Sequence, residues 1–179
     1  MIIQRVVHPP SLWTFQIKPI RELVLKHVGD GRGWADPFAG TSRIAQFTND
    51  LNPSSKADKH MDAYDFLKSF EDSSLNGVLF DPPYSMHQVV TEYEGLGMRK
   101  EAAVMRDEIA RIVMPNGHTI SFGWNTYGIG RSRGFEITEI LIVSHGADRN
   151  DTMATVERKH RTRLDSWAPP EGGHVSDSE

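Results

Sequence analysis

The sequence has 179 residues, of which 38% are hydrophobic and 25% are charged, and its formal net charge is −4. This length suits one domain with a substantial core. The chain contains no cysteine, which excludes disulfide bonds, thiolate catalysis and cysteine-ligated metal sites. No apolar stretch reaches the ~18 residues of a membrane span, and residues 1–10 lack the features of a secretory signal. We therefore expect a cytoplasmic protein without a membrane partner.

A negative net charge is unusual for a protein that binds phosphate backbones over a broad surface, because such binding draws on Lys and Arg. Any contact with nucleic acid is therefore expected to be local. The best candidate is the basic run over residues 158–163, which supplies the candidate substrate-binding residues Arg158, Lys159 and Arg161. A solvated strand end explains this run equally well.

The first predicted element is a helix that begins at Lys18-Pro19, because proline is favoured in a first helical turn. Apolar residues then recur at helical spacing, and Gly29 follows them as a helix end. A short strand is predicted over residues 33–36, with a tight loop and a helix over residues 41–45 after it. A second short strand is expected to end near residues 49–53, and a short helix follows through residues 65–68.

The second half continues the alternation of strands and helices. A strand is predicted to end at Phe80, a helix covers residues 102–113, and strands follow at 119–122 and 137–143. Residues 153–158 are expected to pair with the last of these as an antiparallel terminal strand. This order predicts an α/β fold with a mostly parallel sheet covered on both faces. We expect a single domain over residues 1–165, a disordered tail over 166–179, and a loop at 85–98 that orders over substrate.

Asp81-Pro82-Pro83-Tyr84 follows the apolar run that ends at Phe80, so it is expected at the carboxyl end of a buried strand, where α/β folds bind their ligands. Pro82 and Pro83 have no N–H, which leaves the Asp81 carboxylate and nearby carbonyl oxygens as acceptors. Tyr84 adds a flat ring that can stack on a planar group. A nucleobase with an exocyclic amine fits these features, although a strand end with an ordinary turn would have the same residues.

Three further acids, Asp36, Asp50 and Asp62, each follow a short apolar stretch and are expected to line up beside Asp81. An acid at the end of the second strand, here Asp50, is placed to accept from both ribose hydroxyls of a nucleoside. Asp62 could reach an adenine edge. For any one of these acids alone, a turn or a helix cap is the favoured interpretation, and it is the four in register that indicate a binding site.

With these motifs the sequence resembles the DNA amino-methyltransferases, which use S-adenosylmethionine to methylate adenine N6 or cytosine N4. Residues 81–84 match the family's catalytic tetrapeptide, residues 36–40 resemble its Asp-Pro-Phe-x-Gly loop, and residues 15–19 resemble its Lys-Pro helix start. The resemblance implies a Rossmann-like class I methyltransferase fold, a seven-stranded sheet with a reversed terminal strand, and S-adenosylmethionine as cofactor. The sequence is most similar to short phage and prophage members, which implies the cytoplasm of an infected cell as location.

The resemblance also implies roles for particular residues. The catalytic set is Asp81, Pro82, Pro83 and Tyr84, and Tyr84 is also placed against the substrate base. The cofactor-binding set is Phe15, Ile17, Lys18, Pro19, Asp36, Pro37, Phe38, Gly40, Thr41, Asp50, Leu51, Asp62 and Ala63. After Gly40 the chain has Thr41-Ser42-Arg43 where the family has a small residue, a glycine and a threonine.

The expected reaction is methyl transfer from S-adenosylmethionine to a nucleobase amine, first of all adenine N6 in DNA, with the base flipped out of its stack. No metal is expected, because the histidines lack ligand spacing. The chain has no room for a target-recognition domain, and a homodimer could supply the missing grip on DNA. Three alternatives stay open: methylation of RNA, methylation of a small molecule or amide, and a non-catalytic protein that binds S-adenosylmethionine or nucleic acid.

Overall fold

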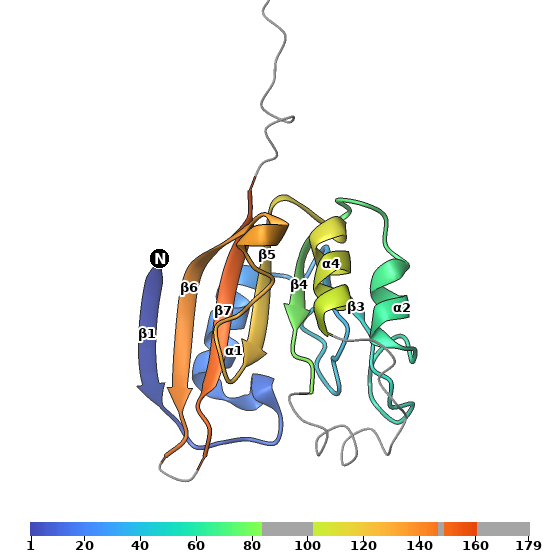
Figure 1. Ribbon diagram of the computed structural model, residues 1–179. Helices are drawn as coiled ribbons and strands as arrows, with labels where there is room; N and C mark the ends of the chain where they lie inside the picture. Colours follow the sequence, from blue (N-terminus) through green and yellow to red (C-terminus); the bar gives the residue numbers. More distant parts are fainter. Residues whose placement is uncertain (84–101, 147–148, 161–179) are drawn as a thin grey trace, which may run out of the picture.

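The computed structural model describes residues 1–83, 102–146 and 149–160. Within them one sheet has seven strands in the order β1-β6-β7-β5-β4-β2-β3 (Figure 1). The strands are β1 (Ile2–Val7), β2 (Trp34–Asp36), β3 (Phe47–Thr48), β4 (Leu75–Phe80), β5 (Val113–Gly123), β6 (Phe135–Ser144) and β7 (Thr152–Lys159). The helices are α1 (Lys18–Val28), α2 (Ala63–Lys68) and α4 (Ala102–Ile112), with short 3-10 turns η1 (Thr14–Gln16) and η2 (Arg131–Arg133).

Strand β7 runs antiparallel to both of its neighbours, β5 and β6, and the other strand pairs are parallel. The prediction of a mostly parallel seven-stranded sheet with a reversed terminal strand is therefore confirmed. Since the parallel strands all point the same way, their carboxyl ends meet at one edge of the sheet. This edge collects the loops that follow β2, β3 and β4.

Helix α1 covers one face of the sheet, and it begins and ends as its sequence predicts. Pro19 lies in the first turn, and Gly29 closes the helix with a φ of 63°. The predicted apolar face is the buried one, with Ile20, Leu23, Val24 and Val28 at 5% exposure or less. These side chains pack on one half of the core, beside Leu79 and Ile120 of the central strands.

Helices α2 and α4 cover the other face, and Figure 1 shows α4 in front of β4 while α1 lies behind the sheet. Met105, Ile109 and Ile112 of α4 are buried in the second half of the core. The helix ends at Ile112, and β5 starts at once, six residues before the predicted strand at 119. Its pairing with β4 jumps from Leu75–Val113 to Gly77–His118, so the segment 114–117, with Asn116 at φ 66°, forms an irregularity within the strand.

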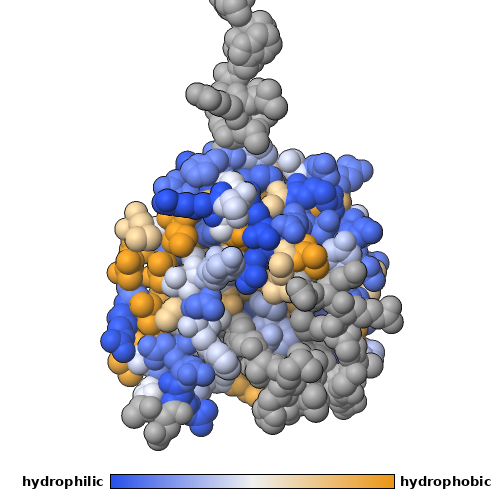
Figure 2. Space-filling view, viewed as in Figure 1, coloured by the Kyte–Doolittle hydropathy of each residue, from blue (hydrophilic) through white to orange (hydrophobic). Residues whose placement is uncertain are grey.

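Two elements differ from the sequence-based predictions. Strand β1, at the edge of the sheet next to β6, was not predicted. It carries hydrophobic side chains on an open edge, visible at the left of Figure 2, with Ile2 51% and Ile3 58% exposed. The predicted helix over residues 41–45 is wrong, because these residues form turns and bends.

The short connection between β2 and β3 explains why no helix forms there. Residues 37–46 must return the chain to the start of a parallel neighbour, a crossing that usually takes a dozen or more residues when it includes a helix. Gln46 anchors the end of this connection: its N–H donates to Gly31 O at 3.1 Å, and its Oε1 accepts from Gly33 N at 2.8 Å. The end of the connection is therefore fixed beside the residues that precede β2.

The connection from β5 to β6 also crosses the sheet without an α-helix, through residues 124–134. The buried carboxylate of Glu157 in β7 holds it, accepting from Ile129 N at 2.6 Å and from Gly130 N at 2.9 Å. Ile129 is fully buried in the core beside α4. No helix among the described residues is long and apolar enough to cross a membrane.

Candidate functional site

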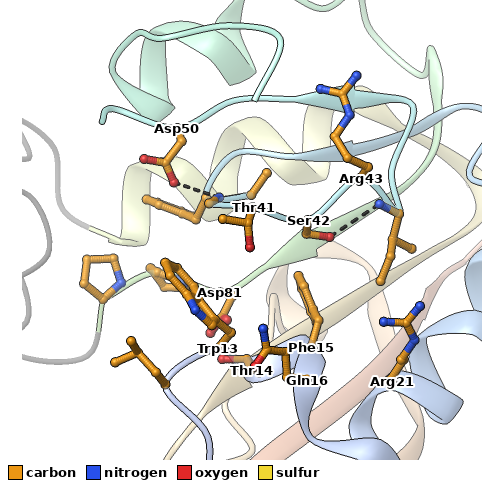
Figure 3. Close-up of a pocket in the computed structure, with 17 residues that line it drawn as sticks. Trp13, Thr14, Phe15, Gln16, Arg21, Thr41, Ser42, Arg43, Asp50 and Asp81 are labelled. Carbon is orange, nitrogen blue, oxygen red and sulfur yellow. Dashed lines mark hydrogen bonds between the residues drawn. The ribbon is translucent and has the colours of Figure 1, made fainter. Parts of the chain in front are cut away.

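A cavity of about 440 Å³ opens at the carboxyl edge of the sheet (Figure 3). Five parts of the chain line it: residues 12–16 before α1, Arg21 in α1, residues 38–44 after β2, Asp50 after β3, and residues 81–83 after β4. This volume lies within the range of small-molecule sites in proteins.

The loop after β2 is fixed by backbone and carboxylate hydrogen bonds. Asp36 is fully buried and its Oδ1 accepts from Phe38 N at 3.1 Å. Ala39 N donates to Asn49 O at 2.8 Å. Gly40 adopts φ 52°, a left-handed conformation that favours glycine, and its N–H donates to Asp50 Oδ2 at 2.8 Å. The loop therefore presents an ordered backbone to the cavity.

Asp50 is 4% exposed and still lines the cavity. Its Oδ2 accepts from Gly40 N, and its Oδ1 accepts from Asn52 N at 2.9 Å. A carboxylate offers about four lone-pair positions, so each oxygen retains acceptor capacity. Asp50 can therefore accept hydrogen bonds from two hydroxyl groups of a ligand while it keeps its hydrogen bonds to Gly40 N and Asn52 N.

The acids at this edge act on one another. Burial raises the pKa of Asp36 well above its ordinary value, the hydrogen bond from Phe38 opposes this, and repulsion from Asp81 and Asp50 adds to it. Asp36 Oδ2 has no hydrogen-bond partner among the residues that the structure describes. Asp50 and Asp81 both line the cavity, and together they create a negative potential that favours a cationic ligand.

Asp81 follows the buried strand β4, and Asp81, Pro82 and Pro83 line the cavity together. Trp13 covers another wall. A Cβ added to Gly40 would lie 3.1 Å from Cζ3 of the indole, so the ring packs directly on the glycine. The side chain of Trp13 is not fully enclosed, because the residue keeps 43% of its surface exposed.

The structure brings part of the predicted cofactor and catalytic sets together at this cavity. The predicted residues that line it are Phe15, Phe38, Gly40, Thr41, Asp50, Asp81, Pro82 and Pro83. The predicted residues that lie outside its lining are Ile17, Lys18, Pro19, Asp36, Pro37, Leu51, Asp62 and Ala63. Tyr84 and Arg161, and the predicted loop over 85–98, fall outside the described residues.

Several predicted residues outside the lining have structural roles. Ile17 is 3% exposed and packs in the core below α1. Asp62 caps α2, where its Oδ1 accepts from Tyr64 N at 2.9 Å. Asp36 supports the loop from beneath. Asp62 is therefore a helix cap in the structure, which is the alternative considered for an acid after a short apolar stretch.

The basic residues Arg158 and Lys159 lie at the opposite edge of the sheet. Arg158 pairs with His118 within β5, and Lys159 pairs with Phe135 at the start of β6. Lys159 Nζ donates to Ala110 O at 2.6 Å and to Val113 O at 2.7 Å. The structure therefore does not bring these two predicted substrate-binding residues to the cavity.

Sequence reasoning missed several lining residues. Trp13 comes five residues before Lys18, and Arg21 lies almost one helical turn after it, so the helix start that drew attention to Lys18 could also have indicated Arg21. Ser42, Arg43 and Ile44 were missed because a helix was predicted there. Within the described part of the chain, no group of His, Asp and Glu is arranged to hold a metal ion.

A scan against protein-family profiles finds no match, and neither does a search of curated proteins. Solved structures do match. A 1,6-didemethyltoxoflavin-N1-methyltransferase from Burkholderia thailandensis, with bound S-adenosylhomocysteine, aligns with a TM-score of 0.55 at 12% identity, over 80% of this chain and 78% of that one. A SAM-dependent methyltransferase from Archaeoglobus fulgidus aligns with a TM-score of 0.53 at 12% identity, over 79% and 94%.

The protein has the Rossmann-like fold of class I methyltransferases. TrmN from Thermus thermophilus shares it, with a TM-score of 0.52 at 16% identity over 80% of this chain. The chain spans 49% of the length of that protein. In the class I methyltransferase fold of this chain, the cavity lies at the carboxyl ends of the parallel strands, where open α/β sheets bind their ligands.

Proposed function

We propose that this protein transfers a methyl group from S-adenosylmethionine to the exocyclic amine of a nucleobase, with adenine N6 in DNA as the preferred target. One observation carries the proposal: Asp81-Pro82-Pro83 and Asp50 line the same cavity at the carboxyl edge of the sheet. An acid suited to ribose hydroxyls and an acceptor suited to an amine thus share one space. The stacking of Tyr84 on the substrate base also belongs to this proposal.

The residues present fit this cofactor. Asp50 has acceptor capacity for two hydroxyl groups, the left-handed Gly40 brings backbone close to the cavity, and the acids Asp50 and Asp81 favour a cation. When bound, S-adenosylmethionine supplies an electrophilic methyl group on a positively charged sulfur. The chain's own residues then have to position the amine and receive its proton.

Asp81 performs both tasks in the proposed mechanism. Its carboxylate accepts a hydrogen bond from the amine, together with the Pro82 carbonyl, and this holds the nitrogen lone pair toward the methyl group. With the cofactor bound, an N–C bond would form as the C–S bond breaks, which would leave a neutral thioether. The nitrogen carries the positive charge until one of its protons departs, with Asp81 as the nearest acceptor.

Transfer of labelled methyl from S-adenosylmethionine to DNA, RNA and free nucleosides tests the proposal. We expect labelled DNA, and its digestion should yield N6-methyl-2′-deoxyadenosine. Asp81→Ala should abolish labelling while S-adenosylhomocysteine still binds within a few fold of wild type, since Asp81 faces the amine. Label in RNA or nucleosides alone would overturn the DNA assignment, and cofactor binding without any transfer would support a binding protein instead.

A further inference from the structure

Three cationic side chains lie near the cavity, and they differ in how far they are already engaged. Lys18, which the helix start singled out, is on the surface: its side chain is 78% exposed, its Nζ lies 3.9 Å from Glu22 Oε1, and it does not line the cavity. It is therefore poorly placed to hold a group of a ligand inside.

Arg43 does line the cavity, but its guanidinium is bound elsewhere. Its Nη1 donates to Lys56 O at 2.7 Å and lies 2.7 Å from Asp58 Oδ1. Hydrogen bonds from Thr48 and then from Arg43 lower the pKa of Asp58, so this carboxylate is well suited to remain the partner of Arg43. A ligand would have to compete with an existing ion pair.

Arg21 lines the cavity as well, and its side chain has no ion pair or hydrogen bond within the described ranges 1–83, 102–146 and 149–160. In Figure 3 it lies at the end of the drawn side chains opposite to Asp50, with Thr41 and Ser42 between them. The guanidinium of Arg21 thus lies at one end of the cavity, and the carboxylate of Asp50 lies at the other.

We propose that Arg21 binds the carboxylate of the amino-acid part of the cofactor, a contact for which Lys18, the cofactor-binding residue that the resemblance implied at this helix start, is poorly placed. This inference rests on the proposed use of S-adenosylmethionine. A ligand with hydroxyl groups at one end and a carboxylate at the other matches a cavity with Asp50 at one end and Arg21 at the other. The planar fork of arginine can donate two parallel hydrogen bonds to a carboxylate.

Calorimetry with two ligands separates this contact from binding in general. S-adenosylhomocysteine carries the carboxylate, and 5′-methylthioadenosine lacks both the carboxylate and the α-amino group of the amino-acid part. We expect Arg21→Ala to lower affinity for S-adenosylhomocysteine about tenfold or more and to leave affinity for 5′-methylthioadenosine within about twofold. Arg21→Lys should recover part of the loss, because it keeps the charge without the fork.

Lys18→Ala is the matched control, since it removes the same charge from the same helical turn. It should change neither affinity. A selective loss of S-adenosylhomocysteine affinity in Lys18→Ala, or an equal loss of both ligands or of neither in Arg21→Ala, would overturn the assignment. If the wild-type protein bound neither ligand, the proposed cofactor itself would be wrong, and that outcome is distinct from the others. Thermal unfolding checks that each variant is folded.

Discussion

Gly40 donates its backbone N–H to Asp50 Oδ2 at 2.8 Å, which joins the loop after β2 to the loop after β3. The glycine needs its left-handed conformation to point this N–H at the carboxylate. Asp50 therefore fixes the cavity wall, and in the proposed cofactor site the same carboxylate also accepts the hydroxyl groups of the ligand.

Asp50→Ala should accordingly lower two quantities at once. Loss of the acceptors leaves Gly40 N and Asn52 N unpaired, which should reduce the free energy of unfolding by about 1–3 kcal/mol. Affinity for S-adenosylhomocysteine should fall by about tenfold or more, because two hydroxyl contacts are lost. Urea unfolding and calorimetry measure the two effects. Asp30→Ala, which removes an acid that is 71% exposed, is the control, and unchanged affinity in Asp50→Ala would remove Asp50 from the binding site.

Trp13 lines a cavity that also contains Asp50 and Asp81, so its ring is placed to contact a positive charge held between them. An aromatic ring attracts such a cation by up to about 2 kcal/mol. Trp13→Leu should therefore weaken binding of S-adenosylmethionine about 2- to 30-fold more than binding of the neutral S-adenosylhomocysteine. Trp13→Phe should give an intermediate result. Equal losses for both ligands would show that the ring contributes packing alone.

Asp36 makes stability depend on pH, because its pKa is raised in the folded protein by burial and by the neighbouring acids. Between its ordinary value of 3.8 and the raised one, the folded state holds more protons than the unfolded chain. The contribution of Asp36 to stability therefore falls as pH rises through this window. Asp36→Asn cannot ionise, so it should gain stability relative to wild type from acidic to neutral pH. Urea unfolding across this range measures it, and a difference that does not vary with pH would contradict the assignment.

Glu157 is 1% exposed and holds the β5–β6 connection through Ile129 N and Gly130 N. Glu157→Ala would leave these two donors without their acceptor, so we expect a loss of about 2–5 kcal/mol in the free energy of unfolding. Glu136→Ala is the control, since that carboxylate is 53% exposed and lies 3.6 Å from His160, and it should stay within about 0.5 kcal/mol of wild type. Comparable losses in both variants would refute the role of Glu157.

Much of the sheet follows from local patterns. Strands β2, β4, β6 and β7 were predicted because buried or half-buried strands carry their own apolar signal. Strand β1 lacks this signal, because it lies at the edge of the sheet and five of its six residues, Ile2 to Val7, are exposed. The prediction of a helix after Thr41 was wrong for a different reason. Strand β3 pairs directly with β2, so the connection between them is short, and this pairing cannot be seen in the local sequence.

The sequence predicted the site residues that follow the ends of strands. It did not predict correctly the residues whose position depends on the direction of a strand or on side-chain packing. Asp50 and Asp81 follow parallel strands, so both reach the carboxyl edge. Arg158 and Lys159 end a reversed strand, so they reach the other edge. This consequence was already contained in the expected antiparallel pairing. Trp13 needed the structure, because only packing shows that the indole covers Gly40. Arg21 could have been suspected from its spacing to Lys18, but only the structure shows that it lines the cavity.

The placement of Asp50 and Arg21 at opposite ends of one cavity gives that cavity a polarity. A ligand that entered the wrong way round would set its carboxylate against Asp50 and its hydroxyl groups against an unsatisfied guanidinium. Repulsion between two carboxylates at one end and a guanidinium that faces no anion at the other would both oppose this arrangement. In the proposed reaction, the two side chains that hold the cofactor thus also reject its reversed orientation, and the methyl group faces Asp81 only when the cofactor is bound in one direction.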